Sequence, residues 1–143
     1  MLDRITTIAR EAGAIIMAHY EAAATAGIEV VHKADDSPLT AADRDANEHS
    51  VAGLEALDPT IPIITEEAAL PPYEDRANWT RFWLVDPLDG TKEFINRNGE
   101  FTVNIALLED GVPTLGVVYA PALDVLYFAS RGQGTHRVRA GGD

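Results

Sequence analysis

The chain has 143 residues and a formal net charge of −12, from 23 acidic and 11 basic side chains, and it contains no cysteine. This length suits one domain with a buried core, and the absence of cysteine excludes disulfides, thiol nucleophiles and cysteine-ligated zinc. The negative charge opposes non-specific binding to nucleic acid and to anionic lipid.

A long amphipathic helix is expected at the start of the chain. Apolar residues recur there at steps of three and four, at Leu2, Ile5, Ile8, Ala12, Ile15 and Ile16. Gly27 is a natural stop, which places the helix near residues 3 to 25. The apolar run at 12–18 is too short for a membrane span, and charges surround it, so neither a secretory signal nor a membrane span is predicted.

A half-buried strand at 28–33 and a turn at 35–38 are expected to lead into a second helix. Thr40 is the predicted N-cap of that helix, with Asp43 in its first turn. The helix should end at Leu57, because Asp58 precedes a proline. Spacing alone leaves Asp43 open to two interpretations, a complement to the helix dipole or a functional carboxylate.

Two short apolar strands each end in acidic residues. The first, at 62–65, runs into Glu66 and Glu67, and the second, at 82–85, runs into Asp86. Prolines and charges at 70–76 favour a surface loop or lid between them.

The segment Asp86-Pro87-Leu88-Asp89 predicts a tight turn that ends at Gly90. Such a turn would bring two carboxylates and the Leu88 carbonyl to one small volume, and hard oxygen ligands of this kind suit Mg²⁺ or Mn²⁺. Gly90 and Thr91 would open a short helix whose free N–H groups attract an anion. A metal beside an anion site indicates phosphoester chemistry. Asp-Pro and Asp-Gly are also ordinary turn dipeptides, so the motif alone is compatible with a purely structural turn.

Further strands are expected at 101–108, 113–120 and 124–129, followed by a hairpin at 131–139. Closely spaced strands with short turns favour an antiparallel meander packed against the helices. The predicted fold class is therefore α+β, a layered helix/sheet sandwich with a largely antiparallel sheet. Phosphate-binding-loop, G-x-S-x-G and H-E-x-x-H motifs are absent from the sequence.

The acidic strand end at Glu66 and Glu67, followed by a strand that runs into D-P-L-D-G-T, resembles the signature of the Mg²⁺-dependent, lithium-sensitive phosphatases. These include inositol monophosphatase and fructose-1,6-bisphosphatase. The continuation K-E-F at 92–94 and the segment N-G-E-F-T-V-N-I-A-L at 98–107 resemble the 3'(2'),5'-bisphosphate nucleotidase branch more than the inositol monophosphatases. The similarity covers essentially the whole chain but only the N-terminal part of the family's usual length.

The resemblance implies a phosphomonoesterase that converts 3'-phosphoadenosine 5'-phosphate to AMP and phosphate, in sulfate assimilation. It implies a cytoplasmic protein, which can lie peripherally on the cytoplasmic face of the inner membrane, and a small phosphorylated nucleotide as its partner. The alternatives are an inositol monophosphatase-type enzyme and a non-catalytic metal-binding fragment.

The resemblance also implies two or three Mg²⁺ ions, which Mn²⁺ can replace. Their ligands would be Glu66, Asp86, Asp89 and the Leu88 carbonyl. The catalytic residues would be Glu66, Thr91 and Asp43, with Asp43 orienting the Thr91 hydroxyl toward the attacking water. The substrate would contact Glu66, Leu88, Asp89, Gly90 and Thr91.

The family supplies a further carboxylate from a Trp-Asp motif beyond the central strand, and no Trp-Asp pair follows Phe94 in this sequence. We therefore expect one N-terminal catalytic-type domain at 1–143, without the family's C-terminal domain and at most weakly active. An apolar face of the sheet should then be exposed.

Overall fold

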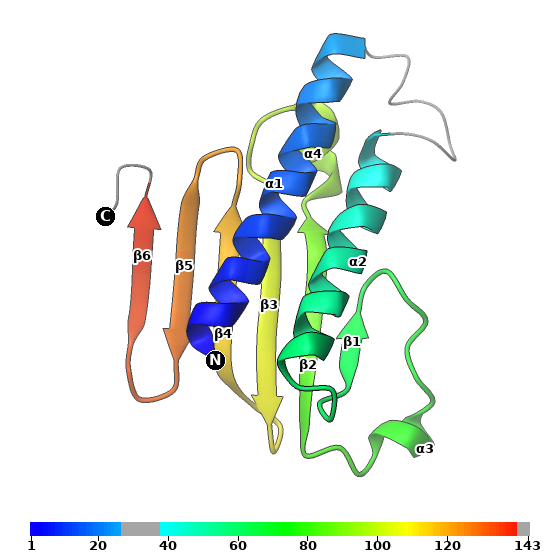
Figure 1. The fold of residues 1–143 in the computed structure, drawn as a ribbon, viewed down its shortest axis with the longest axis vertical. Helices are drawn as coiled ribbons and strands as arrows, with labels where there is room; N and C mark the ends of the chain where they lie inside the picture. The colour runs from blue at the N-terminus through cyan, green and yellow to red at the C-terminus, as the bar shows by residue number, and fades with distance from the viewer. Residues whose placement is uncertain (27–37, 140–143) are drawn as a thin grey trace.

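The computed structural model describes residues 1–26 and 38–139, with the backbone alone at 23–26 and 38–40. Two long helices, α1 (Leu2–Ala26) and α2 (Pro38–Leu57), lie side by side on one face of a six-stranded sheet (Figure 1). The remaining elements are β1 (Ile63–Thr65), α3 (Tyr73–Arg76), β2 (Arg81–Asp89), α4 (Thr91–Asn96), β3 (Thr102–Glu109), β4 (Val112–Ala120), β5 (Val125–Ser130) and β6 (Thr135–Arg139).

The strands follow one another across the sheet in chain order, from β1 to β6. Strands β2 to β6 pair antiparallel, whereas β1 pairs parallel to β2. The predicted α+β fold with a largely antiparallel sheet is confirmed. The expected strand at 28–33 lies outside the described residues.

The predicted N-cap at Thr40 is wrong. Helix α2 already begins at Pro38, so Thr40 lies in its first turn. Proline is favoured at the start of a helix because its fixed φ is helical and it has no N–H to leave unpaired. The predicted helix end at Leu57 is confirmed.

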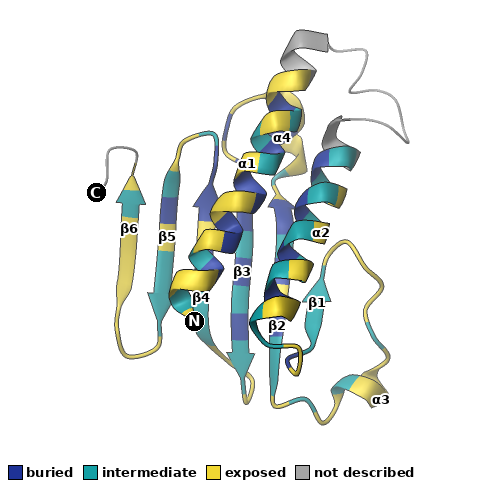
Figure 2. Ribbon diagram, viewed as in Figure 1, coloured by how far each residue is buried: buried dark blue, intermediate teal, exposed yellow. Residues whose placement is uncertain are grey.

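The core lies between the two helices and the sheet. Helix α1 contributes Ile5, Ile8, Ala9, Ala12 and Ile16, and the largest buried side chain of the sheet is Trp83. Figure 2 shows buried positions recurring along each helix and alternating with partly exposed positions along β3. This agrees with the periodicity of the sequence, since one apolar face of an amphipathic helix packs on a sheet.

Gly13 allows α1 to approach β4 closely. A Cβ at this position would lie 2.5 Å from Cε2 of Tyr119 and 3.0 Å from Cβ of Pro121. We expect Gly13→Ala to lower the free energy of unfolding by about 1–3 kcal/mol, because overpacking outweighs the better helix propensity of alanine. Urea denaturation measures the change, and an unchanged or higher value would show that α1 can move away from Tyr119 without cost.

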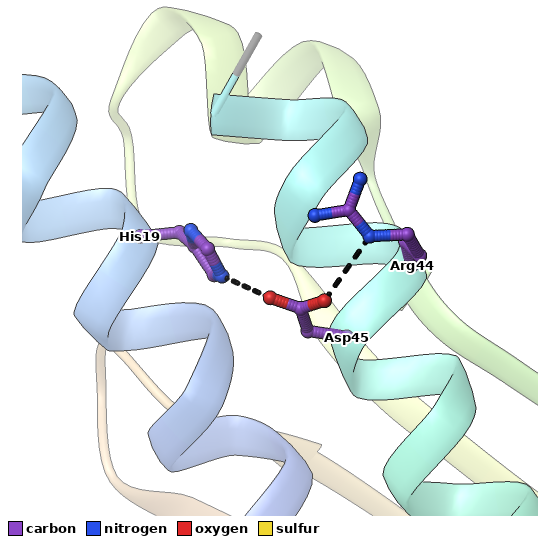
Figure 3. A network of polar contacts seen from close by, with 3 residues as sticks. All are labelled: His19, Arg44 and Asp45. Atoms are coloured by element: carbon purple, nitrogen blue, oxygen red, sulfur yellow. Dashed lines mark hydrogen bonds and ion pairs between the residues drawn. The ribbon is translucent and has the colours of Figure 1, made fainter. Parts of the chain in front are cut away.

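Polar contacts also fix α2 against α1. His19 Nε2 lies 2.9 Å from Oδ2 of Asp45, and Arg44 Nε donates to Oδ1 of the same carboxylate at 3.2 Å (Figure 3). The hydrogen bond with His19, followed by that from Arg44, lowers the pKa of Asp45. One further pair, His49 with Glu11, joins the same helices at 3.0 Å. These contacts hold the helix that carries Asp43.

The opposite face of the sheet is open. Leu84, Val118 and Tyr127 are exposed there, although most of their strand neighbours, which face the helices, are buried. They line one apolar groove of about 730 Å³ that reaches Glu66 and Asp86. The expected exposed apolar face is therefore present. No helix in the described part of the chain has the length and apolar character needed to cross a membrane.

Candidate active site

The parallel pairing of β1 with β2 brings the two acidic strand ends together. Thr65 is paired with Val85, and the N–H of the next residue, Glu66, donates to the Val85 carbonyl at 3.1 Å. Parallel strands end at the same edge of a sheet, so Glu66 lies beside Asp86.

The predicted tight turn at 86–89 is wrong, because these residues continue β2. Asp86 lies opposite Asn104 of β3 and Asp89 opposite Thr102, so β2 has one more residue than β3 in this interval. Residues three apart on a regular strand face opposite sides of the sheet. The extra residue forms a bulge, which returns Asp89 to the side that Asp86 occupies. The bulge therefore brings Asp86 and Asp89 to the same side of the sheet, which is the result expected from the predicted turn.

Gly90 ends β2 with a φ of 99°, in the left-handed region that favours glycine. A Cβ here would also lie 3.2 Å from Cα of Phe101. Helix α4 follows, and the N–H of Phe94 donates to the Gly90 carbonyl at 2.9 Å. The predicted short helix is confirmed, and N–H groups in its first turn have no partner within the helix.

Burial and neighbouring acids act together on Asp86. Burial is the largest cause that raises its pKa, to about 6, and the charges of Asp89, Glu66 and Glu67 raise it further. The Leu88 N–H opposes this shift by hydrogen bonding to the Asp86 carboxylate. The Leu88 side chain is buried. The proposed use of its carbonyl as a ligand remains a prediction.

Asp43 reaches the same cluster from α2. Burial first, and then the charges of Glu67 and Asp86, raise its pKa to about 7, and a hydrogen bond with Glu67 adds to the shift. Its Oδ1 atom is buried without a hydrogen-bond partner. Among the described residues, the structure shows no hydrogen bond between Asp43 and Thr91, so that partnership remains a prediction.

Two neighbours of the cluster were not assigned a role from the sequence. Glu67 acts on Asp43 and on Asp86, and it appeared in the sequence only as the second acid of a pair. Asn104 donates from Nδ2 to Oδ2 of Asp89 at 3.0 Å. Only the strand register, which places Asn104 opposite Asp86, could have indicated it.

The donor set fits a hard divalent cation. Glu66, Glu67 and Asp89 raise the pKa of Asp86, Glu67 and Asp86 raise that of Asp43, and no basic side chain is among the causes of these two pKa shifts. A buried carboxylate oxygen without a partner, at Asp43, points to the same chemistry. Within residues 1–26 and 38–139, however, no three acidic or histidine side chains converge on one point. Without a cation, carboxylates in one site repel one another, which is consistent with acidic side chains that lie near each other but do not point to one centre.

Comparisons with known proteins identify the family to which the chain belongs. Residues 1–139 match the sequence model of the Inositol monophosphatase family. The chain is 55% identical over 133 residues to the 3'(2'),5'-bisphosphate nucleotidase CysQ of Salmonella typhimurium, an alignment that covers 93% of this chain and 53% of that protein.

Solved structures extend the likeness to the fold. The crystal structure of CysQ from Bacteroides thetaiotaomicron superposes with a TM-score of 0.87 at 45% identity, covering 97% of this chain and 49% of that one. Inositol monophosphatase from Anabaena superposes with a TM-score of 0.76 at 29% identity, covering 95% and 46%. The chain therefore spans about half the length of the relatives it matches.

Proposed function

The chain belongs to the inositol monophosphatase family, and from this premise we propose that it provides the carboxylate site of a 3'(2'),5'-bisphosphate nucleotidase. The reaction would release the 3'(2')-phosphate of 3'-phosphoadenosine 5'-phosphate and leave AMP, in sulfate assimilation. The observation that carries the proposal is the pairing of β1 with β2, which brings Glu66 to the bulged Asp86–Asp89 segment. The 55% identity to a nucleotidase of that specificity supports the choice of substrate.

Family members are generally Mg²⁺-dependent. In this chain one ion would be held by Glu66, Asp86 and the Leu88 carbonyl, and a second ion would be held by Asp86 and Asp89. When bound, Mg²⁺ supplies Lewis-acid polarisation of the phosphate and lowers the pKa of a water molecule.

The chain's own residues would handle the proton of the attacking water. Asp43 lies close enough to Glu67 and Asp86 for their charges to raise its pKa in the cation-free chain, and a carboxylate in this position could act as a general base. It would receive the proton directly or through the Thr91 hydroxyl. The water oxygen forms a bond to phosphorus as the ester P–O bond breaks, and the leaving oxygen of the ribose gains a proton.

The start of α4 would bind the phosphate. Gly90 would let the backbone approach the phosphate closely, and the N–H groups of the first helical turn, beginning with Thr91, could donate to phosphate oxygens. These N–H groups would bind the phosphate without contacting the nucleobase. The additional length of the relatives offers room for residues that recognise the nucleotide.

The proposal predicts a substrate preference. In a version extended to the length of the relatives, we expect phosphate release from 3'-phosphoadenosine 5'-phosphate to exceed that from inositol 1-phosphate by at least about tenfold in kcat/KM, because contacts to the nucleotide would add to transition-state binding. The assay measures inorganic phosphate in Mg²⁺, for this chain and for a version extended to the length of its relatives. We expect the extended version to be much faster. Faster hydrolysis of the inositol phosphate would favour the second candidate, an inositol monophosphatase.

A further inference from the structure

We propose that Asn104 is a positioning residue that orients the Asp89 carboxylate for metal binding. The contact is direct, since Nδ2 of Asn104 lies 3.0 Å from Oδ2 of Asp89. It runs diagonally across the bulge, from the residue opposite Asp86 to the carboxylate three positions further along β2. This inference rests on the proposed metal site.

The position of Asn104 follows from the register. Val103 and Ile105 are buried on the helix side, so strand alternation places Asn104 on the open side with Leu84 and Asp86. It lines the apolar groove together with Glu66 and Asp86. Asn104 therefore has access to the carboxylates from a strand that contributes no acid of its own to the cluster.

The amide suits this position because it donates without adding charge. A carboxylate accepts but cannot donate, so the contact with Asp89 requires the amide nitrogen of Asn104. Another acid here would increase the repulsion that already raises the pKa of Asp86, and a lysine or arginine would compete with a cation for Asp89.

The opposite end of the amide shows that this orientation has a cost. Oδ1 of Asn104 is buried without a hydrogen-bond partner. An unsatisfied buried acceptor destabilises a fold, so the contact with Asp89 is made at some expense to stability. A polar group left without a partner is expected where a residue is selected for its role in a functional site and not for stability.

The test compares Asn104→Leu, which keeps the side-chain size and removes the donor, with the unchanged chain. We expect the dissociation constant for Mg²⁺, measured by calorimetry, to rise about tenfold, while the urea midpoint stays the same or increases because the unpartnered Oδ1 is gone. In an Asp89→Asn background the same substitution should have no further effect on Mg²⁺ affinity. Thr114→Val is the matched control, because it removes another side-chain hydrogen bond to a carboxylate of the sheet, donated by the Thr114 hydroxyl to Glu109 at 2.7 Å, away from the cluster.

Two results would overturn the inference: unchanged Mg²⁺ affinity in Asn104→Leu, or a loss of stability with no change in affinity. A chain that binds no Mg²⁺ at all would instead contradict the proposed metal site. In that case, NMR in the presence of a chelator tests the hydrogen bond between Asn104 and Asp89. The side-chain amide protons of Asn104 should shift when Asp89 is replaced by asparagine, and the inference fails if they do not.

Discussion

Replacing Asp86 with asparagine is expected to abolish most of the proposed phosphatase activity while making the cation-free chain more stable. Asp86 is the acid that Glu66, Glu67 and Asp89 all influence, so it lies at the centre of the proposed ligand set. Loss of one metal ligand removes several kcal/mol of transition-state stabilisation, which corresponds to a fall in kcat of roughly 100- to 1,000-fold. Phosphate release in Mg²⁺ measures this effect.

The stability of Asp86→Asn separates a ligand from a structural residue. Burial and three neighbouring acids disfavour the charged carboxylate. At pH 8 in chelator, the asparagine should therefore raise the free energy of unfolding, by about 1 kcal/mol after allowance for partial exposure. An aspartate with a purely structural role would show the reverse, lower stability with activity retained.

Asp75→Asn is the matched control for this experiment. Asp75 lies exposed on α3 and is absent from the causes of the Asp43 and Asp86 pKa shifts. It should change neither the rate nor the stability by a measurable amount. A rate for Asp86→Asn equal to that of this control would reject the proposed role of Asp86.

The elements of the fold could be predicted because their sequence patterns are local. The three- and four-residue spacing from Leu2 to Ile16 defines α1 within one residue at each end, and apolar runs bounded by turn residues define the strands. The meander from β2 to β6 followed from short connections. Parallel pairing of β1 was not stated, since it depends on a partner strand that lies sixteen or more residues further along the chain.

The candidate site was predictable in composition but not in geometry. Asp86 and Asp89 were expected on one side of a turn, because proline and glycine are common in turns. The structure places them on one side of a bulged strand instead, and the register with Asn104 and Thr102 decides this. Register depends on contacts between strands, so the sequence of β2 alone could not show it. For the same reason the sequence predicted a strand that contains Asn104 but no role for its side chain.

A related physical limit applies to Asp43. The sequence pattern predicted Asp43 in the first turn of α2, where it fits a dipole complement as well as a functional acid, but the first turn of α2 contains no acidic residue. What distinguishes the two is the approach of Glu67 and Asp86 from other elements, which no helix pattern encodes. The raised pKa is thus a tertiary property with a testable consequence.

In chelator, the chain is expected to lose stability as the pH rises from 5 to 8. The pKa values of Asp43, about 7, and Asp86, about 6, exceed their ordinary value of 3.8. Between these limits the folded chain keeps protons that the unfolded chain has released, so the stabilisation present at low pH is lost as the pH passes through 6 and 7. The expected fall in the free energy of unfolding is on the order of 2 kcal/mol, reduced from the full shifts because both groups are partly exposed.

Urea denaturation at several pH values, with and without Mg²⁺, measures this dependence. Mg²⁺ should remove most of the fall at pH 8, because a cation that binds only the folded chain stabilises it. Asp43→Asn should flatten the curve in chelator. Asp75→Asn, at an exposed position that is absent from the causes of both pKa shifts, should leave it unchanged. Stability that stays level or rises between pH 5 and 8 would show that the carboxylates do not repel one another as the structure indicates, and the case for a cation among them would lose its electrostatic support.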